Sequence, residues 1–137
     1  MREDKTTLYP NQADAGVMID GIRWATRNVD APGTFADTSE CAGMFFQWNR
    51  RVGWSSTDPM INSDDGAVWN HREVDGTAWY SENDPCPSGW RVPTIWELRT
   101  LGNADCTFKT TDNGVSGRLF GTSPNQIFFA GCELPEY

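Results

Sequence analysis

Few residues of this chain have the chemistry of a catalytic site. The 137 residues include four cysteines but a single histidine, His71, so any Cys–His pair would have to use that imidazole. A lone histidine in a loop is more often an ordinary surface residue than a catalytic group. The sequence also contains no Gly-rich phosphate loop and no G-x-S-x-G elbow. We therefore predict a protein with no catalytic residues.

Oxygen-bearing side chains between residues 58 and 65 are the only candidates for a metal site. Asp58, Asn62, Asp64 and Asp65 supply such oxygens, and calcium takes about six to eight of them. Their spacing does not fit an EF-hand, and an Asp-Asp-Gly sequence is typical of a plain turn. The cysteines form no C-x-x-C pair, so zinc is not expected either. We predict neither a metal nor a cofactor.

The cysteines could instead stabilise the fold. In an exported protein they could form two disulfides, and the sequence does not reveal which cysteines pair. The alternative is that they are small, buried, free thiols. Both interpretations stay open for Cys41, Cys86, Cys106 and Cys132.

Aromatic side chains are the strongest candidates for ligand contacts. Trp54, Trp69, Trp79 and Tyr80 lie within residues 53–83, which show no sustained helix or strand periodicity. A long aromatic-rich loop in a small domain is typically functional or packed over the core. Exposed aromatic rings can stack on sugars or contact a protein partner, whereas buried rings extend the core. We treat these four residues as candidate ligand contacts, with core packing as the alternative.

The composition limits the classes of partner. The net charge of −8 would repel nucleic acid, because binding requires phosphates to be neutralised. No segment approaches the roughly 18 apolar residues of a membrane span, and no signal peptide is visible. The length predicts a single domain, residues 16–137, preceded by a flexible lead-in at residues 1–15.

Residues 84–101 carry the densest local structural signals. Trp90 to Val92 alternate apolar and polar residues, which predicts a short strand that Pro93 ends. Thr94 and Glu97 form a T-x-x-E capping box for a helix over residues 94–101, with Gly102 placed to end it. Ile95, Leu98 and Leu101 share one face of that helix. The structural residues of this block are Cys86, Trp90, Arg91, Pro93, Thr94 and Glu97.

The other elements follow from periodicity and turn signals. Asp20-Gly21 between apolar runs predicts a hairpin over residues 17–24. A second helix is predicted at residues 40–50, because Cys41, Met44, Phe45 and Trp48 share a helix face. This face is interpreted as core, with a ligand-contacting stripe as the alternative. Strands are predicted at residues 106–110, 115–120 and 127–130.

Four blocks of the sequence resemble one bacterial family. The block Cys-Pro-x-Gly-Trp-Arg-Val-Pro-Thr-x-x-Glu-Leu is similar to the signature of the Fibrobacter-type major paralogous domains, and three further blocks match in the family's order, at residues 22–29, 43–50 and 114–121. The W-R-[LV]-P-T-x-x-E core also resembles Legionella collagen-like proteins and formylglycine-generating enzymes. The resemblance implies an α+β, C-type lectin-like fold, with a twisted antiparallel sheet, two helices and a long loop region.

The resemblance also implies a function. It suggests a recognition or adhesion domain of a Bacteroidetes surface or secreted protein, or of a phage virion, with a glycan or protein ligand. One alternative is a relative of the formylglycine-generating enzymes, although Cys106 and Cys132 do not reproduce the close pair of copper-binding cysteines that those enzymes have. The other alternative is a structural module of a pilus or phage assembly. Calcium-dependent sugar binding is not expected, because residues 48–50 and 123–125 each lack a carboxylate that the lectin triplets carry.

The chain ends where relatives continue into their closing strands. The apolar run at residues 127–130 is therefore expected to take a central place in the sheet. The hairpin at residues 17–24 would then lack its usual partner. We predict that a second copy or another chain covers that edge.

Overall fold

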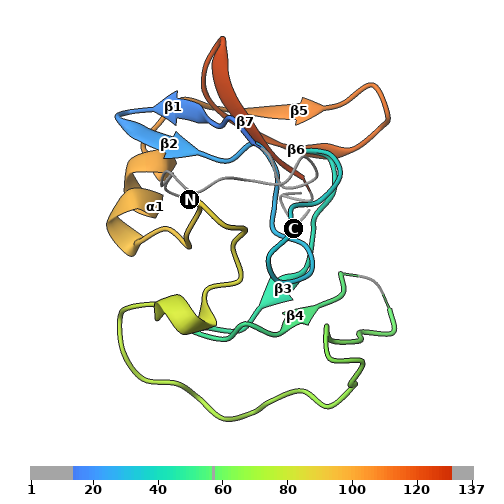
Figure 1. The fold of residues 1–137 in the computed structure, drawn as a ribbon. Helices are drawn as coiled ribbons and strands as arrows, with labels where there is room; N and C mark the ends of the chain where they lie inside the picture. The colour runs from blue at the N-terminus through green and yellow to red at the C-terminus, as the bar shows by residue number, and fades with distance from the viewer. Residues whose placement is uncertain (1–13, 57, 131–137) are drawn as a thin grey trace, which may run out of the picture.

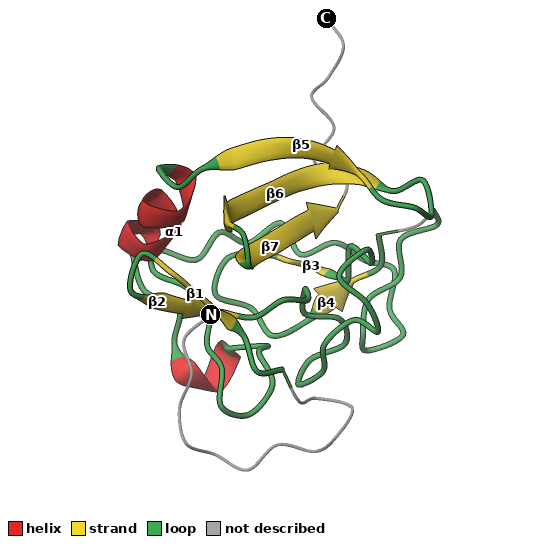
Figure 2. Ribbon diagram, turned by 90° about the horizontal axis from the view of Figure 1, so that it is seen from above, coloured by secondary structure: helices red, strands yellow, loops and turns green. Residues whose placement is uncertain are grey.

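The computed structural model describes residues 14–56 and 58–130, which form three small antiparallel sheets and one α-helix (Figure 1). The sheets are two-stranded, two-stranded and three-stranded, and the three-stranded sheet has the order β5-β6-β7 (Figure 2). In chain order the elements are β1 (Val17–Ile19), β2 (Ile22–Trp24), β3 (Phe45–Phe46), β4 (Gly53–Trp54), the 3₁₀ helix η1 (Ser81–Asn83), α1 (Ile95–Gly102), β5 (Cys106–Thr110), β6 (Ser116–Thr122) and β7 (Asn125–Ala130).

The expected α+β, C-type lectin-like fold with two helices is wrong. Residues 40–50 form turns and β3, not a helix. Gly43 has φ +71°, and a Cβ there would lie 2.2 Å from the carbonyl oxygen of Val29. Asn49 has φ +54°. Two left-handed residues interrupt any right-handed helix through this segment, so the apolar spacing that suggested a helix has another origin.

The predicted hairpin at residues 17–24 is confirmed. β1 pairs antiparallel with β2, and Val17 lies opposite Trp24. Asp20 and Gly21 occupy the turn with φ of +50° and +82°, the backbone that a type I′ turn requires. The Asp-Gly turn signal between two apolar runs therefore identified this element.

Most of the predicted lead-in at residues 1–15 lies outside the described residues. Asp14, at its end, is buried as a side chain and contacts the segment that follows β2. Its carboxylate accepts hydrogen bonds from the backbone N–H groups of Gly16 and Thr26, at 2.9 and 3.1 Å, and pairs with Arg27. A buried carboxylate with this many donors stabilises the start of the fold.

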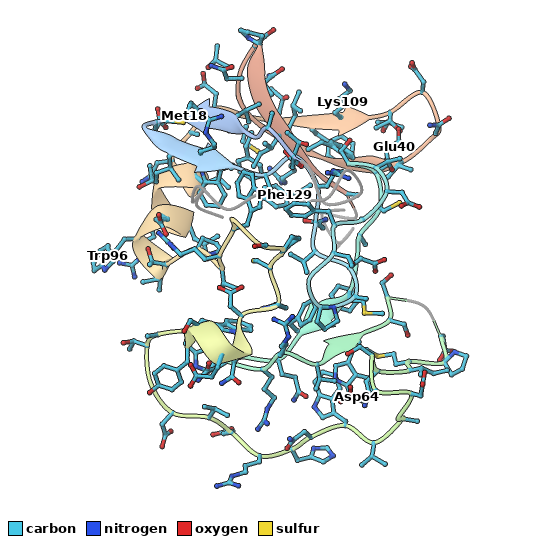
Figure 3. All side chains as sticks on the ribbon, in the orientation of Figure 1. Met18, Glu40, Asp64, Trp96, Lys109 and Phe129 are labelled. Atoms are coloured by element: carbon cyan, nitrogen blue, oxygen red, sulfur yellow. The ribbon has the colours of Figure 1, made fainter. Side chains whose placement is uncertain are left out.

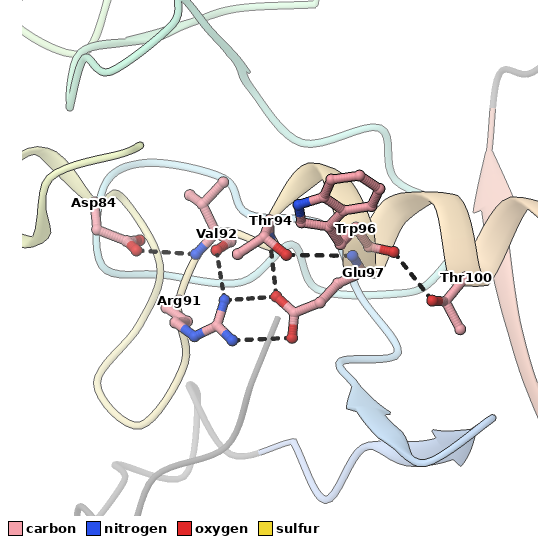
Figure 4. Close-up of polar contacts among 7 residues, drawn as sticks. All are labelled: Asp84, Arg91, Val92, Thr94, Trp96, Glu97 and Thr100. Atoms are coloured by element: carbon pink, nitrogen blue, oxygen red, sulfur yellow. Dashed lines mark hydrogen bonds and ion pairs between the residues drawn. The ribbon is translucent and has the colours of Figure 1, made fainter. Parts of the chain in front are cut away.

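The capping box at the start of α1 is confirmed (Figure 4). Thr94 Oγ1 accepts from the Glu97 N–H at 3.2 Å, and Glu97 Oε1 accepts from the Thr94 N–H at 2.9 Å. Arg91 adds a bidentate ion pair to Glu97, with N–O distances of 2.7 and 2.9 Å. These donors lower the pKa of Glu97 to about 2.

Two details of the same block, the strand and the position of Gly102 after the helix, were predicted wrongly. Trp90 to Val92 form no ladder with any described strand, because the Val92 N–H donates to Asp84 Oδ2 instead. Gly102 is the last residue of α1, and Asn103 is the C-cap in a right-handed conformation. Of the three apolar residues on the predicted face of α1, only Leu101 is buried; Ile95 and Leu98 are exposed.

Two clusters of buried side chains form the core. Cys86 and Trp90 pack with Phe35 in one cluster, where the Trp90 and Phe35 rings meet edge to face at 6.0 Å. The second cluster joins the hairpin, α1 and the three-stranded sheet through Ile19, Trp24, Leu101 and Ile127. Trp90 is therefore buried, as the sequence predicted.

The strand β7 does not take the central place expected for its apolar run. Its ladder is with β6, and it forms one edge of the three-stranded sheet among the described residues. β1 packs beside it through Ile19 and Ile127 without joining the ladder. The edge of a sheet can be covered by packed side chains as well as by another strand, so an apolar strand need not be central.

Neither described helix is long and apolar enough to cross a membrane.

The joint that contains Trp90 should be a main source of stability. Trp90→Ala should lower the free energy of unfolding by about 3–5 kcal/mol, because a large core side chain is removed. Thr94→Ala should cost about 1 kcal/mol through loss of the cap. Urea unfolding followed by fluorescence checks both values, and a Trp90→Ala protein that unfolds like the parent contradicts this assignment.

The ion pair of Glu97 should make stability depend on pH in the acid range. Its pKa is lowered from an ordinary value of 4.5 to about 2, so its contribution is complete above the unfolded-state pKa and is lost as the pH falls toward 2. Glu97→Gln should therefore be less stable than the parent at pH 7, and the difference should shrink between about pH 5 and pH 2. An unchanged difference at both ends would contradict the lowered pKa.

Self-association remains a prediction, because the structure describes one chain. The hairpin strands β1 and β2 form a ladder only with each other among the described residues. Light scattering across a concentration series should show a dimer or a larger species. A monomer at high concentration, with full hydrogen-exchange protection of residues 17–22, contradicts the prediction.

Candidate ligand-binding groove

The long connection between β4 and η1 contains the aromatic-rich loop that the sequence singled out (Figure 1). It begins with a tight turn in which Asn62 Oδ1 accepts from the N–H groups of Asp64 and Gly66, at 2.9 and 2.8 Å. Three of the four candidate calcium ligands, Asn62, Asp64 and Asp65, therefore lie in a plain turn. Among residues 14–56 and 58–130, no three His, Cys, Asp or Glu side chains are grouped to hold a metal ion.

Asn49 fixes the end of this connection. The residue is only 4% exposed and adopts φ +54° in the turn between β3 and β4. Its Oδ1 accepts from the Tyr80 N–H at 2.9 Å and from Asn83 Nδ2 at 3.3 Å. A buried polar group is stable when its partners are present, so this carboxamide joins residues 80–83 to the body of the fold.

Two neighbours of Asn49 contact the middle of the same connection. Gln47 Nε2 donates to the carbonyl oxygen of Asn70, and Arg50 Nη2 donates to that of Arg72, both at 2.7 Å. We call residues 67–80 the 67–80 loop. Residues 47–50 therefore bind this loop through three separate side chains, although the loop has no ladder of its own.

The four aromatic residues proposed as ligand contacts differ in exposure. Trp54 is buried, so the core alternative applies to it. Trp79 is half-buried, and its Nε1 donates to the Asn83 carbonyl at 2.7 Å. Trp69 and Tyr80 remain 40% and 54% exposed. The loop thus presents two of the four predicted rings to solvent.

Two exposed indoles in this region, Trp69 and Trp48, each pack on a more buried one. Trp69 packs on Trp54 with ring centroids 5.0 Å apart. Trp48 meets Trp79 edge to face at 5.3 Å and is itself 42% exposed. Trp48 was interpreted as a core position of a helix, although a ligand-contacting stripe was the alternative. The left-handed backbone of Asn49, which directly follows Trp48, excludes the helix that this interpretation assumed.

A hollow of about 400 Å³ lies between these side chains and the 67–80 loop. Both exposed indoles line it, together with polar side chains of both charges; its lining is Gln47, Trp48, Arg50 and residues 69–75. We call it the first hollow. A second hollow of about 560 Å³ adjoins it and contains Tyr80, Arg51 and Asp64 in its wall.

Among the described residues, no cysteine, serine or threonine lines the first hollow. His71 lines it and is exposed, but no cysteine lines either hollow. Cys86 is a buried free thiol, and burial, reinforced by the nearby Asp84 carboxylate, raises its pKa. Cys41 and Cys106 are exposed and free, while Cys132 lies outside the described residues. A protonated, buried thiol is a poor nucleophile, so Cys86 has a structural role.

The two triplets compared with calcium lectins are not brought together. Residues 123 and 124 form the turn between β6 and β7, and Asn125 is the first residue of β7, whereas residues 48–50 lie between β3 and β4, in a different part of the molecule (Figure 1). The structure therefore provides no joint site for them.

Comparison with family models, with curated proteins and with solved structures finds no match to this chain. The resemblance to the paralogous domain family stays a prediction from sequence. The first and second hollows, which we call the groove, are the candidate functional site.

Asn49 should be required for the groove to keep its shape. Asn49→Ala leaves the Tyr80 N–H without its partner. It also puts alanine in the left-handed region, which alanine adopts less readily than asparagine or glycine. We expect a loss of about 1–3 kcal/mol in unfolding free energy and faster hydrogen exchange at Tyr80. Asn49→Gly keeps the permitted backbone but not the carboxamide, so it should also accelerate exchange at Tyr80. Parent-like exchange in both variants would contradict this role.

Proposed function

We propose that this chain is a non-catalytic recognition module that binds a glycan in the first hollow. The observation that carries the proposal is the pair of exposed indoles, Trp48 and Trp69, lining one concave site. Indole rings offer a large apolar face, which suits the C–H face of a sugar ring, together with a polar N–H. The resemblance to bacterial surface domains supports a place on the cell surface or in a secreted protein.

The polar lining supports a glycan over a purely apolar ligand. Gln47 and Asn70 carry carboxamides, Arg50 and Arg72 carry guanidinium groups, and Glu73 adds a carboxylate. Such groups donate to and accept from hydroxyls, which are the dominant polar groups of a sugar. Small-ligand sites commonly combine aromatic walls with a few polar groups that fix orientation.

The rigidity of the aromatic side chains further supports a binding site. Trp69 packs on buried Trp54, and Trp48 packs on half-buried Trp79. Side chains that are already ordered lose little conformational entropy when a ligand arrives. The overall charge of −8 argues against nucleic acid, which also stacks on aromatic rings.

The exposed indoles should be necessary for binding. The test is to screen the parent against a printed array of plant, microbial and host glycans and to measure its affinity for each hit by calorimetry. Trp48→Ala and Trp69→Ala should each weaken binding at least about tenfold, as expected for a central aromatic contact.

Trp96 provides the matched control. It is 70% exposed and projects from α1 away from the body of the molecule (Figure 3). Trp96→Ala should bind like the parent. The proposal fails if the parent binds no glycan, or if Trp48→Ala and Trp69→Ala bind as well as Trp96→Ala does. Binding of the parent to a protein ligand through the same two indoles would replace the glycan with a protein partner.

A further inference from the structure

The two hollows adjoin each other. They share four lining residues, Gln47, Arg50, Asn70 and Val74, so they meet along the contacts between residues 47–50 and the 67–80 loop. Two of these contacts are the hydrogen bonds from Gln47 to Asn70 and from Arg50 to Arg72. A ligand in the first hollow therefore lies next to the second.

Each hollow has an exposed aromatic ring of its own. The first has Trp48 and Trp69, and the second has Tyr80, which is 54% exposed. The position of Tyr80 is set by its backbone N–H, which donates to Asn49. The backbone that carries the ring is therefore fixed. Each hollow thus has an exposed aromatic surface on which a ligand could pack, which we call its aromatic platform.

The shared residues supply polar groups between these platforms. Arg50 has five N–H donors, of which the bond to Arg72 uses one, and Gln47 has a carbonyl oxygen besides the N–H bound to Asn70. Each unit of a sugar chain has a C–H face that can pack on an aromatic ring and hydroxyls that can bond these polar groups, so both hollows suit such a chain.

The volumes argue for more than one sugar unit. The hollows measure about 400 and 560 Å³ and have four lining residues in common. Each already lies within the range of about 300–1,000 Å³ that holds a whole small-molecule ligand. A single sugar would leave one aromatic platform without contact.

We propose that the site recognises a stretch of a linear glycan several units long, with one unit at Trp48 and Trp69 and a later unit at Tyr80. This inference rests on the proposed function and specifies the class of its ligand. A module of this kind binds the interior of a chain, whereas a single-hollow site would recognise one sugar or a chain end.

The test measures affinity against chain length by calorimetry. The probes are cello-, xylo-, manno-, chito- and galacturono-oligosaccharides of one to six units. For a series that binds, the dissociation constant should fall at least about tenfold between two and four units and then level off. Equal affinity for two and for four or more units would overturn the inference.

Variants of Tyr80 and Trp69 test which aromatic ring provides the added affinity for longer chains. Tyr80→Ala should bind the longer oligosaccharides only as well as the parent binds the disaccharide, while Tyr80→Phe should keep the gain with length. Trp69→Ala should weaken every length. Parent-like behaviour of Tyr80→Ala on long chains would overturn the inference, even where a length effect is present.

The outcomes separate the inference from the proposed function. Binding of short and long oligosaccharides with equal affinity, lost in Trp69→Ala, leaves the recognition function intact and rejects only the extended site. Absence of binding to all five series and to the printed glycans rejects both.

Discussion

A single buried carboxamide oxygen, Oδ1 of Asn49, joins segments that lie 31 residues apart in the chain. It accepts hydrogen bonds from Tyr80 and Asn83, so the far end of a long irregular connection is fixed to the turn between β3 and β4. Gln47 and Arg50 extend the same support to the middle of that connection. The groove exists because residues 47–50 satisfy backbone groups of a loop that has no ladder to satisfy them.

A second set of polar contacts connects this region to the core. Asp84 follows η1, and its carboxylate accepts from the backbone N–H groups of Cys86 and Val92 at 2.8 and 2.9 Å. Arg51, from the groove side, donates to the Asp84 carbonyl. The segment that begins with Asp84 leads to buried Trp90 and to the capped start of α1. The loop is thus positioned by residues on both of its flanks, and each flank belongs to a well-packed part of the molecule.

The sequence predicted the elements that local chemistry determines. Asp20-Gly21 between apolar runs specified the hairpin, and Thr94 with Glu97 specified the start of α1. The strands β5 to β7 were predicted as the segments between turn signals, and only β7 contains an apolar run. The helix expected at residues 40–50 failed because apolar spacing ignores backbone handedness, which Gly43 and Asn49 reverse. The same error concealed the exposure of Trp48, because the apolar face of the expected helix was assigned to the core. Periodicity also could not separate buried Trp54 from exposed Trp69, because that difference is set by which ring lies beneath the other.

The claim that a glycan occupies the groove is tested most directly by observing the indole N–H signals of all seven tryptophans during titration with a bound oligosaccharide. Assignment by single Trp→Phe variants makes each signal a reporter of its own site. The account predicts shifts for Trp48 and Trp69, which line the first hollow, and none for Trp96 on α1 or for Trp90 in the core. Shifts confined to Trp96, or absent from both Trp48 and Trp69 at saturation, would contradict it.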